Sequence, residues 1–330
     1  MQLIDTYNRR LNYLRISITD RCNLRCRYCT PRHQIPMLLH KEILSYEEIL
    51  HLIRIAVPLG ISKVRITGGE PLTRKGVCEF IRAVCQIDGI RDVALTTNGV
   101  LLKTRVDGLL NAGLRRINIS LDTLDPEKFK NITGVDAFHD VWEGIMEAHR
   151  AGIAPIKINT VALRHFNDNE LEDIARLSFT YPFHFRFIEY MPIGMSDKGQ
   201  TDCLYTPEIK QILTDRIGPP IPVEQHAGDG PAERFRFEGA VGEVGFISAM
   251  SHHFCHTCNR LRLTASGQLR SCLLSDRQLD LKTPLRSGAS DEALAAVFLK
   301  AASMKGIHHG LTADMPGCVQ VSSRMSSIGG

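Results

Sequence analysis

The chain has 330 residues, of which 43% are hydrophobic and 23% charged, so it can bury the core of one large α/β domain with an appendage, or of two domains. Its net charge of +4 is too small for a nucleic-acid scaffold, although it allows a local basic pocket for an anion. The sequence has neither an apolar run of about 18 residues nor the apolar stretch of a signal peptide, so we expect a cytoplasmic protein without a membrane partner.

Short apolar segments alternate with helical patterns over the first two thirds of the chain. We expect six strands, at Tyr13–Thr19, Ile61–Thr67, Asp92–Thr97, Arg116–Leu121, Pro155–Leu163 and Phe183–Tyr190. Repeated βα units predict parallel strands joined by right-handed crossovers. Because six units are too few to close an eight-stranded barrel, the prediction is an incomplete (βα)6 barrel of the TIM type. A flatter doubly wound sheet is the alternative.

The helical segments carry recognisable start and stop signals. Ser45 and Glu48 form a capping box at the start of one helix, and Gly60 suits the position just after its end. Apolar residues from Val77 to Cys85 lie on one face of a second helix.

After about residue 195 the pattern changes to shorter elements. A helix begins at Thr206-Pro207, strands are expected at Arg234–Phe237 and Glu243–Ile247, a hairpin at Ala265–Gln268, and an amphipathic helix at Ser290–Met304. We therefore predict two domains, 1–219 and 220–330. The second is an antiparallel β extension with a helix that closes the open side of the barrel.

Polar residues gather where the expected strands end. In β/α barrels the carboxyl ends of the strands surround the active site, so these residues are expected to face one cavity. They are Thr67-Gly68-Gly69-Glu70, Thr96-Thr97-Asn98, Ser120-Leu121-Asp122, Asn159 and Glu189-Tyr190-Met191.

Three cysteines follow the first strand with the spacing Cys-x3-Cys-x2-Cys, at Cys22, Cys26 and Cys29. A short loop can turn three thiols toward one metal centre, and three ligands leave one iron of a four-iron cluster open for a small molecule. The alternatives are a zinc site completed by His33 or His40, and unconnected buried thiols.

A second trio of cysteines lies in the C-terminal part, at Cys255, Cys258 and Cys272. A Cys-x-x-Cys turn and a third cysteine on the return strand of a hairpin can meet at one centre. The alternative is a zinc site with His252, His253 or His256 as fourth ligand. Arg260 and Arg262 lie on one side of the adjoining strand, where guanidinium groups suit phosphate or a purine edge.

The first triad, with the aromatic Tyr28 before its last cysteine, resembles the cluster loop of the radical S-adenosylmethionine superfamily. Both triads together, Thr67-Gly68-Gly69-Glu70-Pro71, Asn259-Arg260-x-Arg262 and the Ile328-Gly329-Gly330 ending closely resemble the GTP 3′,8-cyclase family of molybdenum cofactor biosynthesis. The resemblance runs from about Asp5 to the C-terminus.

This resemblance implies a radical enzyme with two [4Fe-4S] clusters that uses S-adenosylmethionine to cyclise GTP to (8S)-3′,8-cyclo-7,8-dihydroguanosine 5′-triphosphate. In the family, a 5′-deoxyadenosyl radical removes hydrogen from ribose C3′, and the carbon radical attacks C8 of guanine. The resemblance also implies a homodimer, an electron donor, and transfer of the product to a cyclic pyranopterin monophosphate synthase.

The resemblance assigns roles residue by residue. Cys22, Cys26 and Cys29 would hold the first cluster, and Cys255, Cys258 and Cys272 the second. S-adenosylmethionine would contact Tyr28, Gly69, Ser120 and Met191. GTP would contact Arg15, Arg65, Thr96, Lys157, Arg260, Leu261 and Arg262, with Lys63 and Arg186 as basic neighbours; Arg15, Arg260 and Arg262 are also the expected catalytic residues.

Other residues are assigned no chemistry. Asp122 and Glu189 are expected to be strand-end caps or supporting partners, and Cys78, Cys85, Cys203 and Cys318 structural or incidental thiols. The tail would enter the barrel, although Ser327 replaces the tyrosine that the family often has there. Two competing functions remain: a radical enzyme that modifies a peptide, and a zinc-binding module without catalysis.

Overall fold

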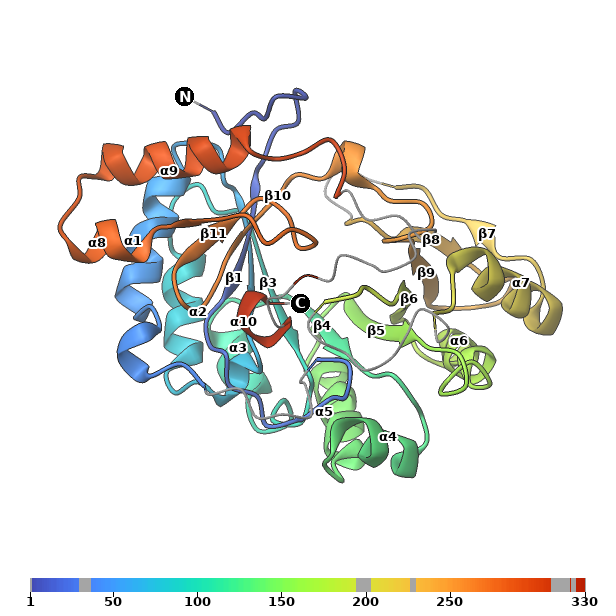
Figure 1. The fold of residues 1–330 in the computed structure, drawn as a ribbon. Helices are drawn as coiled ribbons and strands as arrows, with labels where there is room; N and C mark the ends of the chain where they lie inside the picture. The colour runs from blue at the N-terminus through green and yellow to red at the C-terminus, as the bar shows by residue number, and fades with distance from the viewer. Residues whose placement is uncertain are drawn as a thin grey trace.

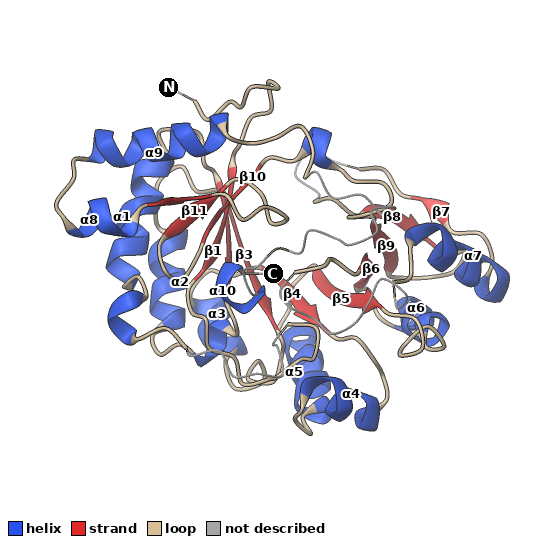
Figure 2. Cartoon of the chain, viewed as in Figure 1, coloured by secondary structure: helices blue, strands red, loops and turns tan. Residues whose placement is uncertain are grey.

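The computed structural model describes residues 2–29, 37–193, 203–225, 230–309, 321 and 325–329. Its strands form one open sheet in the order β12-β11-β10-β1-β2-β3-β4-β5-β6-β9-β8-β7 (Figure 1). The strands from β10 to β9 in this order are parallel to one another, and the outer pairs at each end are antiparallel. The helices lie outside the curved sheet, except for the short α10 (Met325–Ile328), which lies on its inner side near the C-terminus (Figure 2).

The six strands predicted for the barrel are confirmed in position and in order. They are β1 (Tyr13–Ser17), β2 (Lys63–Thr67), β3 (Asp92–Thr97), β4 (Arg116–Ser120), β5 (Ile156–Ala162) and β6 (His184–Glu189). Each is parallel to the next, as expected for βα units whose connections cross on one side of a sheet.

The C-terminal strands extend both edges of this sheet, which periodicity alone does not predict. On one edge β10 (Arg260–Leu263) pairs in parallel with β1 and continues to β11 (Gln268–Arg270) and β12 (Gln278–Asp280). On the other edge β9 (Glu243–Ile247) pairs in parallel with β6 and is followed by β8 (Glu233–Arg236) and β7 (Ile221–Pro222). The expected β10–β11 hairpin is confirmed, and the division at residues 219 and 220 stays a prediction.

The start of helix α1 (Tyr46–Ala56) shows how local sequence sets these boundaries. The Ser45 hydroxyl accepts a hydrogen bond from the Glu48 backbone N–H, and the Glu48 carboxylate accepts one from the Ser45 N–H, at 3.1 and 2.6 Å. This reciprocal pair satisfies two donors that the first turn would otherwise leave open.

The other helices follow the sheet connections and the C-terminal part. They are α2 (Val77–Cys85), α3 (Val106–Asn111), α4 (Pro126–Thr133), α5 (Phe138–Arg150), α6 (Leu171–Thr180), α7 (Thr206–Ile217), α8 (Lys282–Arg286), α9 (Asp291–Ser303) and α10 (Met325–Ile328). None of the helices that the structure describes combines the length and apolarity needed to cross a membrane.

Alternation along each strand separates the apolar core from the inner face of the sheet. In β1, Leu14 and Ile16 are fully buried in the main hydrophobic core, whereas Tyr13 and Arg15 line a cavity on the opposite face. The same alternation places Lys63 and Arg65 of β2 in that cavity. The inner face of the barrel is therefore polar and basic, while the outer face is covered by helices.

Candidate active site

Three arginines stand side by side across neighbouring strands on the inner face. Arg15 of β1 is in register with Arg262 of β10 and with Arg65 of β2, and all three line the cavity. Parallel neighbouring strands are about 4.8 Å apart, so the guanidinium groups share one small region. Like charges in direct register destabilise a sheet, which marks this row as a feature kept for a ligand.

The pKa values of this region show the strength of the positive field. The pKa of Arg15 lies well below its ordinary value because of burial, and because Arg262 and Arg65 repel its charge. Burial and the charge of Arg260 lower the pKa of Arg262 to about 9. Burial alone would raise the pKa of Tyr13. The surrounding cations outweigh this effect and lower the pKa below its ordinary value. An anion bound here would relieve these unfavourable charges.

Further cations of the cavity come from the other side of the barrel. Lys157 of β5 and Arg186 of β6 are only 4% exposed and line the same space. Lys63, at the start of β2, forms a 2.8 Å ion pair with Asp92, so part of its charge is already compensated. The cavity therefore has cations on both walls, as binding of a polyanionic ligand requires.

The loop that carries the first cysteine triad is fixed by hydrogen bonds. The Cys22 thiol accepts them from the Leu24 N–H at 3.4 Å and from the Asn98 side chain at 3.7 Å. Burial raises the pKa of Cys26 well above its ordinary value, and the neighbouring Cys29, Asp122 and Cys22 add to this. Burial, then Asp122, raises the pKa of Cys29 to about 12. The thiols of this triad therefore influence one another's pKa, and their binding of one metal centre stays a prediction.

Gly68 and Gly69 pack directly against the start of this cysteine loop. A Cβ on Gly69 would lie 2.3 Å from the Arg21 carbonyl oxygen, and one on Gly68 would lie 2.8 Å from that of Thr19. The Gly69 N–H donates to the Thr19 oxygen at 2.7 Å. The two glycines are therefore required by a close approach of backbone to backbone. Contact of Gly69 with S-adenosylmethionine stays a prediction.

Replacement of Gly69 with alanine is expected to disorder the first cysteine loop, because the added methyl group cannot fit against the Arg21 backbone. The variant should lose about half of its iron and its ability to cleave S-adenosylmethionine, while iron held by the second triad remains. Iron analysis and 5′-deoxyadenosine formation measure this effect. Gly152→Ala is a control that strains a left-handed residue (φ +81°) but meets no atom within 4 Å, so it should cost some stability and keep its iron. Equal iron loss in both variants would contradict the explanation.

The second cysteine triad lies in a more positive environment than the first. Burial raises the pKa of Cys258, but the charges of Arg260 and Lys305 outweigh this and lower it to about 7. Burial raises the pKa of Cys255 above its ordinary value, and a hydrogen bond from the His309 backbone N–H offsets part of this rise. Arg260 also lies over the Phe254 ring, with 4.7 Å between the guanidinium carbon and the ring centroid.

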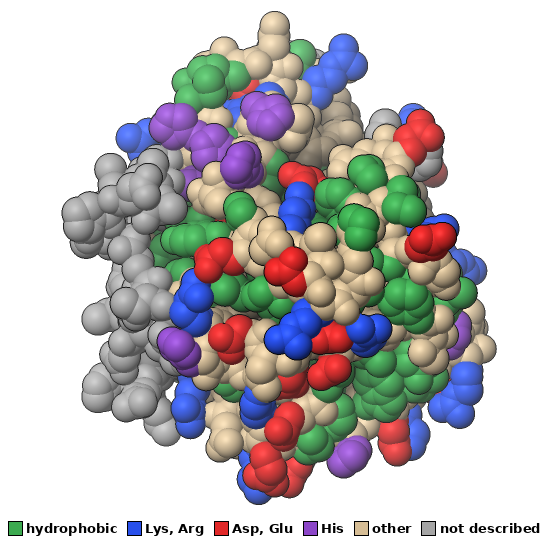
Figure 3. Space-filling view, turned by 90° about the vertical axis from the view of Figure 1, so that its right-hand side faces the viewer, with side chains coloured by type: hydrophobic (Ala, Val, Ile, Leu, Met, Phe, Trp, Pro, Cys, Tyr) green, Lys and Arg blue, Asp and Glu red, His purple; other side chains and the backbone are tan. Residues whose placement is uncertain are grey.

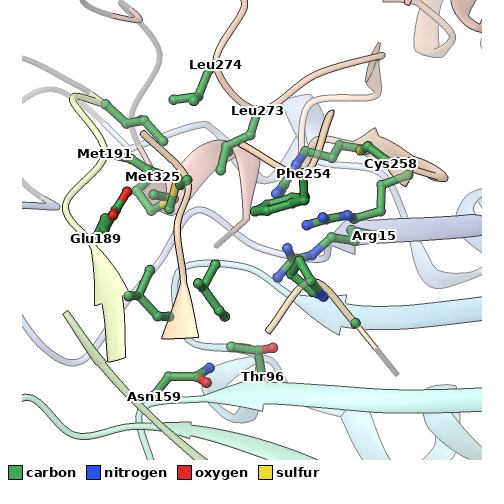
Figure 4. Close-up of a pocket in the computed structure, with 18 of the residues that line it drawn as sticks. Arg15, Thr96, Asn159, Glu189, Met191, Phe254, Cys258, Leu273, Leu274 and Met325 are labelled. Carbon is green, nitrogen blue, oxygen red and sulfur yellow. The ribbon is translucent and has the colours of Figure 1, made fainter. Parts of the chain in front are cut away.

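The structure brings both triads to one cavity. Cys29 of the first triad and all three cysteines of the second line it. Figure 4 shows Cys258 among the lining residues. Arg15 and Cys258 lie on one side in this view, and Glu189 and Met191 on the opposite side. The predicted residues that line the cavity are Arg15, Tyr28, Cys29, Lys63, Arg65, Thr96, Ser120, Lys157, Arg186, Met191, Cys255, Cys258, Arg260, Arg262 and Cys272.

Four predicted site residues are not among the lining residues. Cys22 and Cys26 pack against the main core beside Cys29, and Gly69 lies behind the cysteine loop. Leu261 is fully buried in β10 and belongs to the core. Its side chain therefore serves packing, and only its backbone is near the arginines on either side.

The C-terminal tail reaches this cavity as expected. The Arg262 guanidinium donates a hydrogen bond to the Gly329 carbonyl oxygen. Gly329 has φ of +75°, and a Cβ there would lie 2.6 Å from the Thr67 hydroxyl. The Ser327 carbonyl oxygen accepts a hydrogen bond from Ala265 N–H at 3.4 Å, which holds the tail despite the missing tyrosine. Gly330 lies outside the described residues.

Asp122 and Glu189 have structural partners, as predicted. Asp122 accepts hydrogen bonds from the Tyr28 hydroxyl at 2.5 Å and the Val161 N–H at 2.9 Å. Glu189 is fully buried and accepts bonds from the N–H groups of Thr206, Met250 and Ser251. Both carboxylates also line the cavity, and these hydrogen bonds fix the loops around it. That the two residues take no part in the chemistry stays a prediction.

Some cavity residues were not predicted from the sequence. Tyr13 and Arg116 line the cavity. Strand alternation could have indicated them, because side chains two positions apart in a strand lie on the same face. Lys305, Phe254 and Met325 also line it, but they belong to no motif and no periodic pattern. Cys78 and Cys85 pack beside the core as expected, and Cys203 packs in a small cluster near Tyr190. Cys318 lies outside the described residues.

Histidines gather on one face of the molecule (Figure 3). Ring contacts join His253 to His308 and His309, with centroids 6.0 and 5.2 Å apart, and His253 and His309 reach the cavity. Across the parts of the chain that the structure describes, no three His, Cys, Asp or Glu side chains converge as a single bound ion requires. His33, one candidate zinc ligand, lies outside those parts. Each triad supplies only cysteine thiols, which are the ligands that iron–sulfur clusters take.

Several buried polar atoms of the cavity walls would gain partners from a ligand. Within the described residues, Arg65 Nε, Thr96 Oγ1 and Asn159 Oδ1 have no hydrogen-bond partner. Such atoms are costly unless a ligand or water satisfies them. They are both donors and acceptors, on three different strands, as recognition of a nucleotide requires.

Comparison with known families divides the chain into two matched parts. Residues 16–178 match the family model "Radical SAM superfamily", and residues 183–311 match "Molybdenum Cofactor Synthesis C". The first range contains the first cysteine triad, and the second contains the second triad. Each family model therefore covers one of the two cysteine triads at the cavity.

Similar solved structures support the fold alone. The SuiB protein of Streptococcus suis has a TM-score of 0.60 with 16% identity, covering 92% of this chain and 68% of that protein. The structure of the same protein bound to its precursor peptide SuiA has a TM-score of 0.61.

Curated relatives match nearly the full length. GTP 3′,8-cyclase of Pelotomaculum thermopropionicum is 48% identical, with 99% of each chain covered. That of Thermodesulfovibrio yellowstonii is 52% identical, covering 91% of this chain and 94% of the relative. The enzyme of Moorella thermoacetica is 48% identical, with 99% of each chain covered. The chain therefore belongs to the GTP 3′,8-cyclase family of the radical S-adenosylmethionine superfamily.

Proposed function

We propose that the chain converts GTP to (8S)-3′,8-cyclo-7,8-dihydroguanosine 5′-triphosphate in the cavity between its two cysteine triads. The observation that carries this proposal is the row formed by Arg262, Arg15 and Arg65, in register across three strands. Arg262 is buried and Arg15 and Arg65 are half-buried. Like charges in such a row are unfavourable without an anion, and a triphosphate supplies several negative charges.

The cofactors are S-adenosylmethionine and two [4Fe-4S] clusters, which supply the radical chemistry when bound. The protein contributes binding, orientation and exclusion of water. Cys22, Cys26 and Cys29 are the proposed ligands of the first cluster, and Cys255, Cys258 and Cys272 those of the second. Three thiols in each set leave one iron of each cluster open.

The two ends of GTP have different proposed partners. Arg260, Arg262 and the open position of the second triad would hold the guanine base, whose oxygen and nitrogen acceptors suit guanidinium donors. Arg15, Arg65 and Lys157 would hold the phosphates, and Lys63 and Arg186 would add positive charge. Thr96 would donate from its hydroxyl, which has no other partner among the described residues. The ribose would then lie in the middle of the cavity, between the triads.

S-adenosylmethionine has proposed contacts on the other side. Ser120 and Met191 line the cavity near the first triad, as does Tyr28. Burial and the adjacent Asp122 raise the pKa of Tyr28 well above its ordinary value, so its phenol stays protonated. A neutral phenol bonded to Asp122 can orient the cosubstrate without giving up a proton during the reaction. Orientation matters because the reacting atoms must approach within about 3–3.5 Å.

Anaerobic incubation with dithionite, S-adenosylmethionine and GTP tests the proposal. The expected result is 5′-deoxyadenosine together with a cyclised nucleotide, and none of that product with ATP, whose base presents a donor where guanine presents an acceptor. A radical enzyme that acts on a peptide is the second candidate. The only feature that supports it here is the barrel fold, which a peptide-binding protein shares. Formation of 5′-deoxyadenosine that is unaffected by GTP would favour that candidate.

Four further expectations follow from the family relationship. We propose that the chain acts as a homodimer in the cytoplasm, receives electrons from a separate donor, and passes its product to a cyclic pyranopterin monophosphate synthase. Measurement of the mass in solution and assay of the coupled reaction would check the first and last of these.

A further inference from the structure

Lys305 is a buried lysine that the sequence motifs do not include. It follows helix α9, is 4% exposed, and lines the cavity on the side of the second cysteine triad. Its ammonium group donates hydrogen bonds to the Arg260 carbonyl oxygen at 2.9 Å and the Ser271 carbonyl oxygen at 2.5 Å. Arg260 is two residues after Cys258, and Ser271 immediately precedes Cys272. One side chain therefore joins the two segments that carry these cysteines.

The charge of Lys305 has no carboxylate partner among the residues that the structure describes. Burial of an ammonium group costs several kcal/mol unless a negative group compensates it. The thiols of the second triad line the same cavity as Lys305, beside the two segments that its ammonium group joins. Cysteine ligands deprotonate when they bind iron, so the cluster itself would supply the missing counter-charge.

The backbone around Lys305 is held by the N-terminal segment. Arg9 forms a buried ion pair with Asp5 and donates hydrogen bonds to the Cys255 carbonyl oxygen at 2.5 Å and the Gly306 carbonyl oxygen at 2.7 Å. Arg9 thus ties the turn after Lys305 to the first cysteine of the same triad. Three segments far apart in the sequence meet at this point, so the lysine has little freedom to move away from the cysteines.

We propose that Lys305 is a positioning residue of the second cluster, which holds the Cys258 and Cys272 segments together and raises the reduction potential of that cluster. The inference rests on the proposed function, because it assumes that Cys255, Cys258 and Cys272 bind a cluster. Reduction adds one electron from the donor to the cluster and makes it more negative. A fixed positive charge beside it stabilises the reduced form relative to the oxidised form.

Lys305→Gln is the central variant, because glutamine keeps a donor for the two carbonyl groups and removes the charge. The expected result is nearly full iron content with a lower midpoint potential for the second cluster. At the unaltered protein's midpoint, the ratio of reduced to oxidised second cluster should fall about tenfold, which corresponds to about 59 mV for one electron. Electron paramagnetic resonance during anaerobic titration with dithionite measures both clusters, and the first cluster serves as the internal reference.

Companion variants separate charge from packing. Lys305→Arg keeps the charge and should keep the potential, whereas Lys305→Met removes charge and donor and should also lose iron from the second cluster. Lys300→Met, at an exposed lysine of α9, should change neither. An unchanged midpoint in Lys305→Gln, or iron loss in Lys305→Met that Lys305→Arg fails to avoid, would overturn the proposal. If Cys258→Ala leaves the iron content unchanged, the assignment of the second triad fails instead.

Discussion

Replacement of Cys26 with alanine is expected to abolish 5′-deoxyadenosine formation and to remove roughly half of the iron, because two ligands cannot retain a four-iron cluster that three hold. Replacement of Cys258 should remove the other half and abolish conversion of GTP, while the first cluster remains. The physical reason is that each triad is its own site, with thiols close enough to influence one another only within a triad. Iron and sulfide analysis of anaerobically purified protein, with nucleotide product analysis, measures both effects.

Cys85→Ala is the matched control for these variants. Cys85 belongs to helix α2 and packs beside the hydrophobic core away from both triads. This variant should keep its full iron content and its activity, with at most a moderate loss of stability from the lost packing. The assignment would be wrong if Cys26→Ala and Cys258→Ala lost the same iron signal, since that would mean one shared centre.

Replacement of Arg15 with methionine is expected to change binding and stability in opposite directions. A hydrogen bond between charged groups contributes about 1.5–3 kcal/mol, so loss of the guanidinium should raise the KM for GTP by about 10- to 150-fold. The KM for S-adenosylmethionine should stay nearly constant. The folded protein without ligand should become more stable, by up to about 1 kcal/mol, because Arg262 and Arg65 no longer repel a third charge.

Initial-rate kinetics and denaturant unfolding of the ligand-free protein measure these two quantities. Arg54→Met, at an exposed position on α1, is the control that changes one charge far from the cavity and should alter neither quantity. If Arg15→Met destabilised the protein and left the KM for GTP unchanged, the arginine row would have to be regarded as structural.

The fold is common to SuiB, whose sequence is only 16% identical. The inner face of this cavity carries arginines on β10, β1 and β2 and a lysine and an arginine on β5 and β6. The barrel provides the strands, and we expect these side chains to select an anionic ligand.

The sequence by itself determined the local elements and both cysteine triads. Strand alternation, capping signals and βα order depend on residues near each other in the chain, which is why the strands from Tyr13 to Glu189 were predicted with their order. The triads could be recognised because each occupies a short segment. Alternation indicated that Arg65 faces inward, whereas the cavity positions of Lys157 and Arg15 were predicted with the help of the family resemblance.

Only the tertiary structure decided which distant segments meet. The parallel pairing of β10 with β1 places Arg262 beside Arg15, although 246 residues lie between them in the sequence. The requirement for Gly69 comes from the Arg21 backbone, and the place of Lys305 comes from carbonyl groups on two other segments. Such contacts depend on how the chain closes long loops to pair strands, and no local pattern encodes that choice.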